Sequence, residues 1–278
     1  FFPLIIFRNA FSPFNFGKVV VFRVFVEILL ALYIYLAIKY PEFRPRVKNW
    51  IFISLSLFTF SFIVSTFIGV SWQNSFWGYF ERMGGLFSWL HYFAFFVIAV
   101  SILRTKRDWF TLLKLSIIAS LISTIYGFLQ KTDLPQIVGA EGRARIIGTS
   151  GNAAAFGGYL LFNIYFALFF LLKGDANNAN EHTNDANKSR MAMRAFFLAV
   201  VLIESVAIVM TGVRGTILAL IASGILYSVF SLTKKRYKIA LAILVVFIVG
   251  GFIFANNAEK LGLQRLSNFS LEQRNIQT

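Results

Sequence analysis

One stretch decides how this chain must fold: Arg143-Ala-Arg-Ile-Ile-Gly-Thr-Ser-Gly-Asn-Ala-Ala-Ala-Phe-Gly-Gly-Tyr159. It places two arginines and four glycines directly before an apolar run, residues 160–172. That run can be buried only in lipid or in protein. Charged side chains beside such a run are costly unless an anionic group meets them, so the stretch predicts a bound anion at this position.

Composition assigns the chain to the polytopic membrane proteins. Of its 278 residues 58% are hydrophobic and 14% are charged, whereas soluble domains are roughly 45–50% apolar and about 25% charged. A soluble fold of this length could not bury so much apolar surface, so we expect an all-α bundle of transmembrane helices. The sequence has no cysteine and only two, widely separated histidines, so we expect no metal and no cofactor.

A complete span needs about twenty apolar residues. We expect eight complete spans and one truncated span over residues 1–7, because the chain begins with Phe and both ends look like cuts within a longer protein. All of them are expected to form one transmembrane domain, residues 1–278. The expected complete spans are residues 19–38, 51–69, 85–103, 110–129, 153–172, 195–212, 216–232 and 239–255.

The distribution of lysine and arginine predicts the orientation. We attribute the net charge of +15 to cytoplasmic loops and anionic lipids rather than to nucleic acid, because the basic residues fall between apolar runs. One set of alternate loops is richer in them and belongs in the cytoplasm. This rule places the opening stretch and Arg214 on the outer face, together with residues 256–278, the expected start of an outer loop. The richer loops are residues 39–48, 104–107, 173–194 and 234–238.

Two loops have distinct compositions. Residues 174–189 are Asn-rich and lack apolar periodicity, so we expect a disordered cytoplasmic loop. The outer loop 70–84 alternates aromatic and polar residues, which predicts a short helix in the lipid headgroup zone. Contact with a substrate is the alternative for this loop. Glu81 and Arg82 at its end are possible additional site residues.

Ionisable side chains inside the spans need partners, because an isolated charge at mid-membrane costs roughly 2.5–3.5 kcal/mol on insertion scales. Arg23 and Glu27 are four residues apart and share a helix face, which permits an ion pair. His91 is expected to hydrogen-bond a neighbouring helix. Glu204 has no local partner in the sequence, so either it pairs with an arginine of another helix or it marks a polar pathway.

A second arginine–glycine segment, Thr211-Gly212-Val213-Arg214-Gly215, joins two apolar runs without a loop. Two glycines around one arginine predict a helix end, a tight turn and a new helix start. Gly215, the second of these glycines, is a supporting residue of the expected site. Helix N-termini present free backbone N–H groups and the positive end of the helix dipole, which suit a phosphate. The planar guanidinium of Arg214 can hold phosphate oxygens at two points.

The stretch quoted first repeats this combination. Arg143 and Arg145 precede Gly148-Thr149-Ser150-Gly151, whose small residues let the backbone approach a ligand closely. Thr149 or Ser150 can donate to a ligand oxygen, and Asn152 can cap the following helix. One such arginine alone would be interpreted as snorkelling at the interface. Two glycine-flanked basic segments on the same face favour a shared anion site.

These residues resemble the O-antigen ligase and O-antigen polymerase superfamily of bacterial envelope glycosyltransferases. The resemblance rests on Arg145-Ile-Ile-Gly148-Thr149 followed by Asn152, and on Thr211-Gly-Val-Arg214-Gly215 at the start of an apolar helix. Residues 75–83 are similar to one branch of ligase-like proteins. The chain departs from the family pattern at Ala153, where the family often has proline, and at Val213, where it often has a hydroxyl residue.

The resemblance implies a metal-independent enzyme that moves a glycan from undecaprenyl diphosphate to an acceptor hydroxyl, on lipid A–core or on another glycan. It implies the bacterial inner membrane, with the active site facing the periplasm, and diphosphate binding by Arg145 and Arg214. We add Arg143 to the diphosphate-binding residues on the basis of the sequence pattern alone, not of the resemblance. The family's catalytic histidine lies in a large outer loop, which would begin near Asn256, so we expect no catalytic base in this chain.

Three alternatives stay open at this point. An O-antigen polymerase and a protein-glycosylating ligase would use the same donor chemistry. A transporter or flippase for a lipid-linked solute, a different class, would use outer arginines to guide a head group. Such a transporter is expected to show paired repeats with interrupted spans, and the sequence shows no such repeat.

Overall fold

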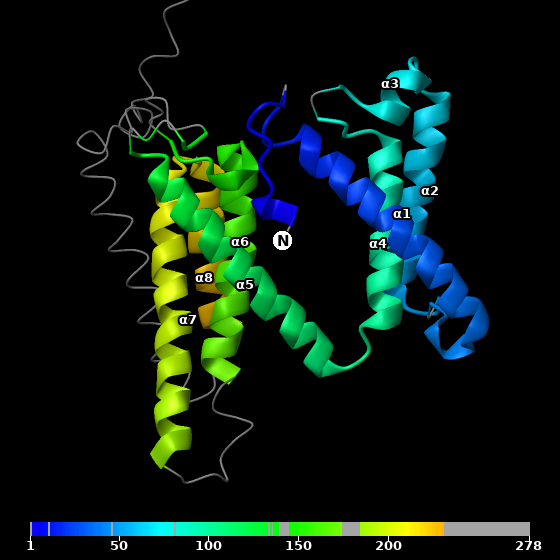
Figure 1. Ribbon diagram of the computed structural model, residues 1–278. Coiled ribbons are helices and arrows are strands. Elements are labelled where there is room, and N and C mark those ends of the chain that lie inside the picture. Colours follow the sequence, from blue (N-terminus) through cyan, green and yellow to red (C-terminus); the bar gives the residue numbers. More distant parts are fainter. Residues whose placement is uncertain are drawn as a thin grey trace, which may run out of the picture. The chain divides into compact units, whose positions relative to one another are not determined.

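A computed structural model of the protein describes residues 2–10, 12–45, 47–80, 82–132, 134, 136–138, 145–173 and 184–230; the side chains of 173, 184–189, 225 and 227–230 are outside this description. Throughout these ranges every regular element is a helix (Figure 1). The prediction of an all-α fold is therefore confirmed for this part of the chain.

The chain forms two compact units, Phe1–Leu113 and Lys114–Thr278. Helix α5 (Lys106–Leu129) begins in the first unit and continues into the second. That the two units act as one transmembrane domain stays a prediction. The first unit holds η1 (Phe2–Leu4), α1 (Phe16–Lys39), η2 (Pro41–Phe43), α2 (Trp50–Ile68), α3 (Trp72–Trp77) and α4 (Leu86–Ile102). The second unit adds η3 (Gly148–Ser150), α6 (Ala153–Lys173), α7 (Asn184–Met210) and α8 (Arg214–Phe230).

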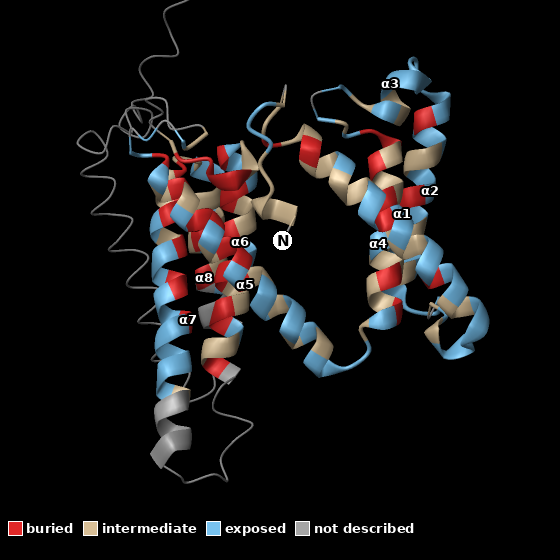
Figure 2. Ribbon diagram, viewed as in Figure 1, coloured by how far each residue is buried: buried red, intermediate tan, exposed pale blue. Residues whose placement is uncertain are grey.

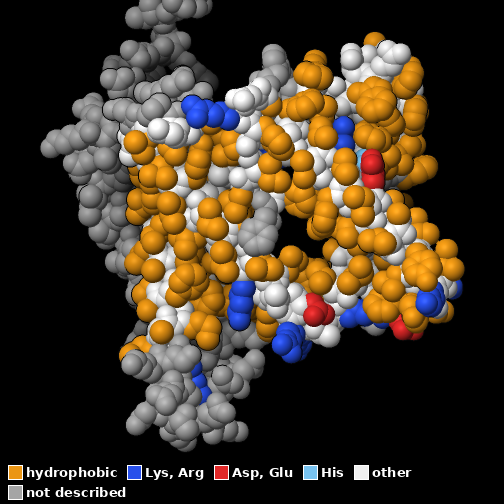
Figure 3. Space-filling model, viewed as in Figure 1, with side chains coloured by type: hydrophobic (Ala, Val, Ile, Leu, Met, Phe, Trp, Pro, Cys, Tyr) orange, Lys and Arg blue, Asp and Glu red, His pale blue; other side chains and the backbone are white. Residues whose placement is uncertain are grey.

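By length and composition the chain is a multi-pass membrane protein. Large apolar side chains are exposed along α1, α2 and α7, as lipid-facing helices require (Figure 2), and the face seen in Figure 3 is largely hydrophobic. Five helical segments are long and apolar enough to cross a membrane, namely Phe16–Lys39, Trp50–Ile68, Lys106–Leu129, Ala153–Leu172 and Arg190–Met210. Two shorter apolar helical segments are Leu86–Ile102 and Arg214–Gly224.

Eight complete spans are not observed in the described residues. The expected span 85–103 is the 17-residue helix α4, which is one residue shorter than expected at each end, and just beyond it the Arg104 Nε donates to the Ser101 carbonyl, 2.8 Å away. The side chains of residues 225 and 227–230 are outside the description, so the expected span 216–232 is not tested over its full length. The expected span 239–255 and the expected outer loop 256–278 lie outside the described residues.

At two further places the described local structure differs from the expectation. Residues 2–4 form one 3₁₀ turn and residues 5–7 are not helical, so no helical end of a truncated span is found there. Instead the Phe2 ring packs on Phe22 and Phe25 of α1. Residues 184–189, expected to be disordered, are the first turns of α7, because extending an existing helix needs no new nucleus. Residues 174–183 lie outside the described residues.

The charged residues inside the first unit pair differently from the expectation. Arg23 and Glu27 do not form the expected ion pair. Arg23 Nη2 donates to Ser88 Oγ at 2.7 Å and to the Met83 carbonyl at 3.2 Å. His91 Nε2 lies 3.1 Å from Glu27 Oε1, which confirms that His91 bonds a neighbouring helix. Contacts with Ser88 and His91 of α4 therefore replace the expected ion pair between residues four apart on α1. These contacts also give the buried side chains of Ser88 and His91 hydrogen-bond partners.

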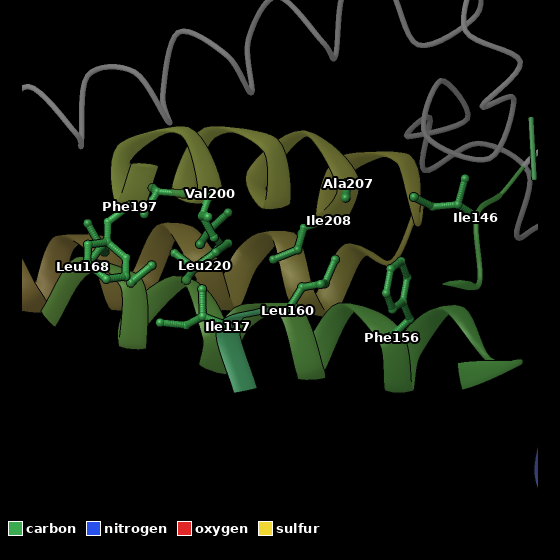
Figure 4. Packing of buried hydrophobic residues seen from close by; sticks show 13 residues of the cluster. Ile117, Ile146, Phe156, Leu160, Leu168, Phe197, Val200, Ala207, Ile208 and Leu220 are labelled. Atoms are coloured by element: carbon green, nitrogen blue, oxygen red, sulfur yellow. The ribbon is translucent and has the colours of Figure 1, made fainter. Parts of the chain in front are cut away.

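The second unit is held by an apolar core between α5, α6, α7 and α8 (Figure 4). Phe156, Leu160 and Ile164 of α6 are fully buried against it. Close approach of α6 and α8 depends on Gly157, since a Cβ added there would lie 2.9 Å from Thr216 Oγ1. A small residue at such a contact is how transmembrane helices come close together. The buried set includes Ile117, Ile146, Phe156, Leu160, Ile164, Ala167, Leu168, Phe197, Val200, Val201, Ala207, Ile208 and Leu220.

We predict that Gly157→Leu destabilises the protein by about 1–3 kcal/mol, because it overpacks the contact with α8. The adjacent Gly158→Leu is the matched control, since a Cβ added at Gly158 meets no atom within 4 Å. The measurement is the thermal unfolding midpoint of both variants in detergent. Equal midpoints for the two variants would contradict the close approach of α6 and α8.

Candidate functional site

The turn between α7 and α8 carries Arg214 at the start of α8. Helix α7 ends at Met210, and the Gly212 N–H donates to the Val209 carbonyl at 2.9 Å. Gly212 has a φ of +61°, which is left-handed backbone that glycine adopts without strain. Helix α8 then begins at Arg214. The prediction that one helix ends here, the chain turns tightly and a new helix begins is confirmed.

The loop that precedes α6 is fixed by Gln130, a buried residue just after α5. Gln130 Oε1 accepts from the N–H groups of Ile147 and Gly148, at 3.0 and 2.9 Å. Gln130 Nε2 donates to the carbonyls of Gly148 and Val138, at 3.0 and 3.1 Å. One side-chain amide therefore satisfies four backbone groups of two segments. Sequence reasoning missed Gln130, because nothing in its position marks which distant backbone it bonds.

Gly148 and Thr149 face the inside of the unit. Gly148 has a φ of +53°, and a Cβ added there would lie 2.5 Å from the Phe156 ring. The Thr149 hydroxyl is buried, 2.6 Å from Ser123 Oγ on α5. Both residues were expected to meet a ligand, through close backbone approach and through a hydroxyl donor, and this stays a prediction. The described contacts pack Gly148 against Phe156 of α6 and Thr149 against Ser123 of α5.

Asn152 caps α6, as the sequence predicts. Its Oδ1 accepts from the N–H of Ala154 at 2.8 Å and from that of Ala155 at 3.4 Å. The preceding residue, Gly151, has a left-handed φ of +69°, which turns the chain into the helix. Two of the N–H groups that a helix start leaves without partners are thereby satisfied.

The loop and the turn meet, which brings the two arginine–glycine segments together. The Ile146 N–H donates to the Met210 carbonyl at 3.2 Å, and Arg145 Nε donates to the Thr211 carbonyl at 2.6 Å. Arg145 is half-buried, and Arg214, three residues beyond Thr211, is exposed. We call Arg145, Thr211 and Arg214 the arginine junction.

The other expected site residues are Arg143, Glu81, Arg82 and Gly215. Arg143 and Glu81 lie outside the described residues. Arg82 is exposed in the first unit, where its N–H donates to the Tyr79 carbonyl at 3.0 Å. Gly215 is exposed, and a Cβ added there would meet no atom within 4 Å, so packing does not require glycine at this position.

The junction has the chemistry of an anion site. A guanidinium has five N–H donors in a rigid fork, and the Thr211 bond uses one of those of Arg145. Arg214 stands at the first turn of α8, where backbone N–H groups and the helix dipole also favour an anion. Within the described ranges, no group of three or more His, Cys, Asp or Glu residues could hold a metal ion.

Comparison of the chain with protein-family models, with curated proteins and with solved structures finds no match.

We predict that Gln130→Leu loosens the loop, because it leaves the N–H groups of Ile147 and Gly148 and the Gly148 carbonyl without their buried partner, at about 1–3 kcal/mol for each unsatisfied group, whereas the Val138 carbonyl keeps the Tyr126 hydroxyl at 3.3 Å. Faster hydrogen exchange at Ile147 and Gly148 is the expected result. Gln136→Leu, an exposed position before the same loop, is the control and should leave exchange unchanged. Unchanged exchange in Gln130→Leu would show that the loop is held by other contacts.

Proposed function

We propose that this chain binds the donor of a membrane glycosyltransferase, which transfers a glycan from undecaprenyl diphosphate to an acceptor hydroxyl. One observation carries the proposal: the loop of Arg145 is bonded to the turn that presents Arg214. Two arginines from segments far apart in the sequence then stand beside one helix start. A diphosphate has enough oxygens to bond both guanidinium groups and the helix N–H groups at once.

The residues fit the charge changes of this reaction. The bond between sugar C1 and the diphosphate oxygen breaks, and its electron pair leaves with the diphosphate. The acceptor oxygen forms the new bond to C1 and loses its proton to a base. Arginines fixed beside the diphosphate stabilise the growing negative charge more in the transition state than in the bound donor. The junction itself contains no general base, so that role falls to a residue outside it.

The membrane arrangement is part of the proposal. The resemblance to the O-antigen ligase and polymerase superfamily, together with the lysine- and arginine-rich alternate loops, supports eight complete spans in a bacterial inner membrane. The arginine junction would then face the periplasm, where lipid A–core, another glycan or a protein hydroxyl is the acceptor. Ligase, polymerase and protein-glycosylating ligase share this donor site and differ in the acceptor.

A proton-coupled carrier of a lipid-linked anionic solute is the second candidate, and one observation favours it. Glu204 is fully buried inside a span of the second unit, and transporters use such carboxyls as proton relays. A carrier would move the labelled donor across a vesicle membrane in the absence of any acceptor. A transferase would consume the donor only when an acceptor is present.

We predict that Arg214→Ala weakens binding of undecaprenyl diphosphate by roughly 10–100-fold, because hydrogen bonds to a charged group contribute about 1.5–3 kcal/mol. For Arg145 the lysine variant is preferable, since alanine would also remove the bond to Thr211 that holds the turn. Lysine keeps the charge and loses the fork, so we expect weaker binding by a smaller factor. The measurement is binding of the labelled lipid to the intact protein in nanodiscs.

Arg194→Ala is the matched control, because Arg194 is an exposed arginine near the opposite end of α7. Undecaprenol, which lacks the diphosphate, controls for recognition of the lipid tail. Wild-type affinity in both junction variants, with the fold intact by thermal unfolding, would refute the proposed donor site.

A further inference from the structure

Helix α5 presents a row of hydroxyl groups to the interior of the second unit. Ser116, Ser120, Ser123 and Thr124 lie on one face of the helix, since they are spaced by three, four and eight residues. Ser120, Ser123 and Thr124 are fully buried. We call these four residues the hydroxyl row. Hydroxyl groups buried in an apolar span cost free energy unless each has a hydrogen-bond partner. A row of them therefore indicates a functional role.

Glu204 of α7 meets this row in the core. Its side chain is fully buried, and its Oε1 is in hydrogen-bond contact with Ser120 Oγ. Its Oε2 is buried and has no hydrogen-bond partner among the residues that the structure describes. The same holds for Thr124 Oγ1, one helical turn from Ser120. Buried polar atoms without partners are rare, and each calls for an explanation.

The single hydrogen of the Ser120 hydroxyl indicates whether Glu204 is protonated. Ser120 Oγ lies 2.9 Å from the Ile117 carbonyl oxygen, which can only accept, as well as beside Glu204 Oε1. A serine hydroxyl has one hydrogen and can donate to only one of these two oxygens. Both contacts become hydrogen bonds when Ser120 donates to Ile117 and a protonated Glu204 donates to Ser120.

The surroundings of Glu204 favour the same state. Within the described residues no lysine, arginine or histidine forms an ion pair with it, and the one such pair found is His91 with Glu27 in the first unit. The facing groups are Ser120 on α5 and Tyr159 on α6, which is close enough to interact with it electrostatically. On the described part of α8 the ionisable side chain is Arg214, at the end of that helix. An ionised carboxylate here would be an uncompensated charge in an apolar core.

We propose that Glu204 is a proton-binding site inside the membrane, and that the hydroxyl row connects it to the loop at Thr149. Polar groups follow one another along the row: Glu204 contacts Ser120, Thr124 lies one turn later, and Ser123 contacts Thr149 at 2.6 Å. Thr124 Oγ1 has no hydrogen-bond partner among the described residues, so it would pass the proton between these two contacts by a rotation of its side chain.

The site lies directly below the arginine junction in the fold. Glu204 precedes Thr211 by seven residues of the same helical segment, which corresponds to about 10 Å along the axis at 1.5 Å per residue. A proton that reaches Glu204 from the loop therefore enters next to the turn that holds Arg145. This inference stands on the second unit alone and does not require the proposed glycan transfer.

Infrared spectroscopy of the intact protein in nanodiscs tests the protonated state at neutral pH. We expect a protonated-carboxyl band that shifts in D₂O, is absent in Glu204→Gln and persists in Glu27→Gln, the control glutamate of α1. Ser120→Ala retains the carboxyl and removes its partner, so it should move the band and serves if Glu204→Gln does not fold. A carboxylate signal from Glu204 would overturn the proposal, whether it is present in every buffer or appears only with added sodium.

The rate of deuterium exchange at the same band tests the route. We expect Thr124→Val, which has the shape of threonine without the hydroxyl, to slow exchange at least tenfold. Ser116→Ala is the matched control, because Ser116 bonds Asn163 Oδ1 at 2.8 Å, on the other side of Ser120 from the loop, and it should leave the rate unchanged. Equal rates in wild type and Thr124→Val, or equal slowing in both variants, would exclude this route.

Discussion

The end of the second unit that carries the turn between α7 and α8 depends on the hydrogen bond from Arg145 Nε to the Thr211 carbonyl. The last carbonyls of a helix have no intrahelical partners, and in an apolar surrounding each one needs another donor. Arg145 supplies that donor, and the neighbouring Ile146 N–H supplies another to Met210. Because the helix end requires this bond, the guanidinium is held beside the start of α8 by the fold itself. Such preorganisation is what an anion site needs, since the side chain loses little freedom when the ligand binds.

Polar satisfaction explains the other contacts around the junction. Gln130 bonds four backbone groups, and Asn152 caps α6, so the loop is ordered although it stands at the end of apolar helices. Against this pattern, Glu204 Oε2 and Thr124 Oγ1 are two of the three buried side-chain atoms without a described partner. Their position along one polar row connects them to the loop rather than to the lipid. Anion binding and proton binding in this unit would therefore share the same supporting segment, residues 145–152.

Much of the fold follows from composition and from glycine and asparagine signals. The apolar runs predicted the helices, Gly212 predicted the turn before Arg214, and Asn152 predicted the cap of α6. Sequence reasoning failed where a residue's role depends on a distant partner. The residues next to Gln130 in the sequence do not show that its side chain bonds the loop before α6. Nor do they show that Gly148 packs on Phe156. The pairing of Glu27 with His91 rather than with Arg23 likewise depends on a distant helix. The expectation of eight complete spans stays a prediction, because the described residues contain five helical segments long and apolar enough to cross a membrane and two shorter ones.

The most direct measurement of the central proposal is a structure of the intact membrane protein with undecaprenyl diphosphate bound. We predict density for the diphosphate within hydrogen-bond distance of the Arg145 guanidinium and of Arg214, with the Arg145 Nε still bonded to the Thr211 carbonyl. Diphosphate density elsewhere in the protein, with the arginine junction unchanged and unoccupied by the lipid, would contradict it.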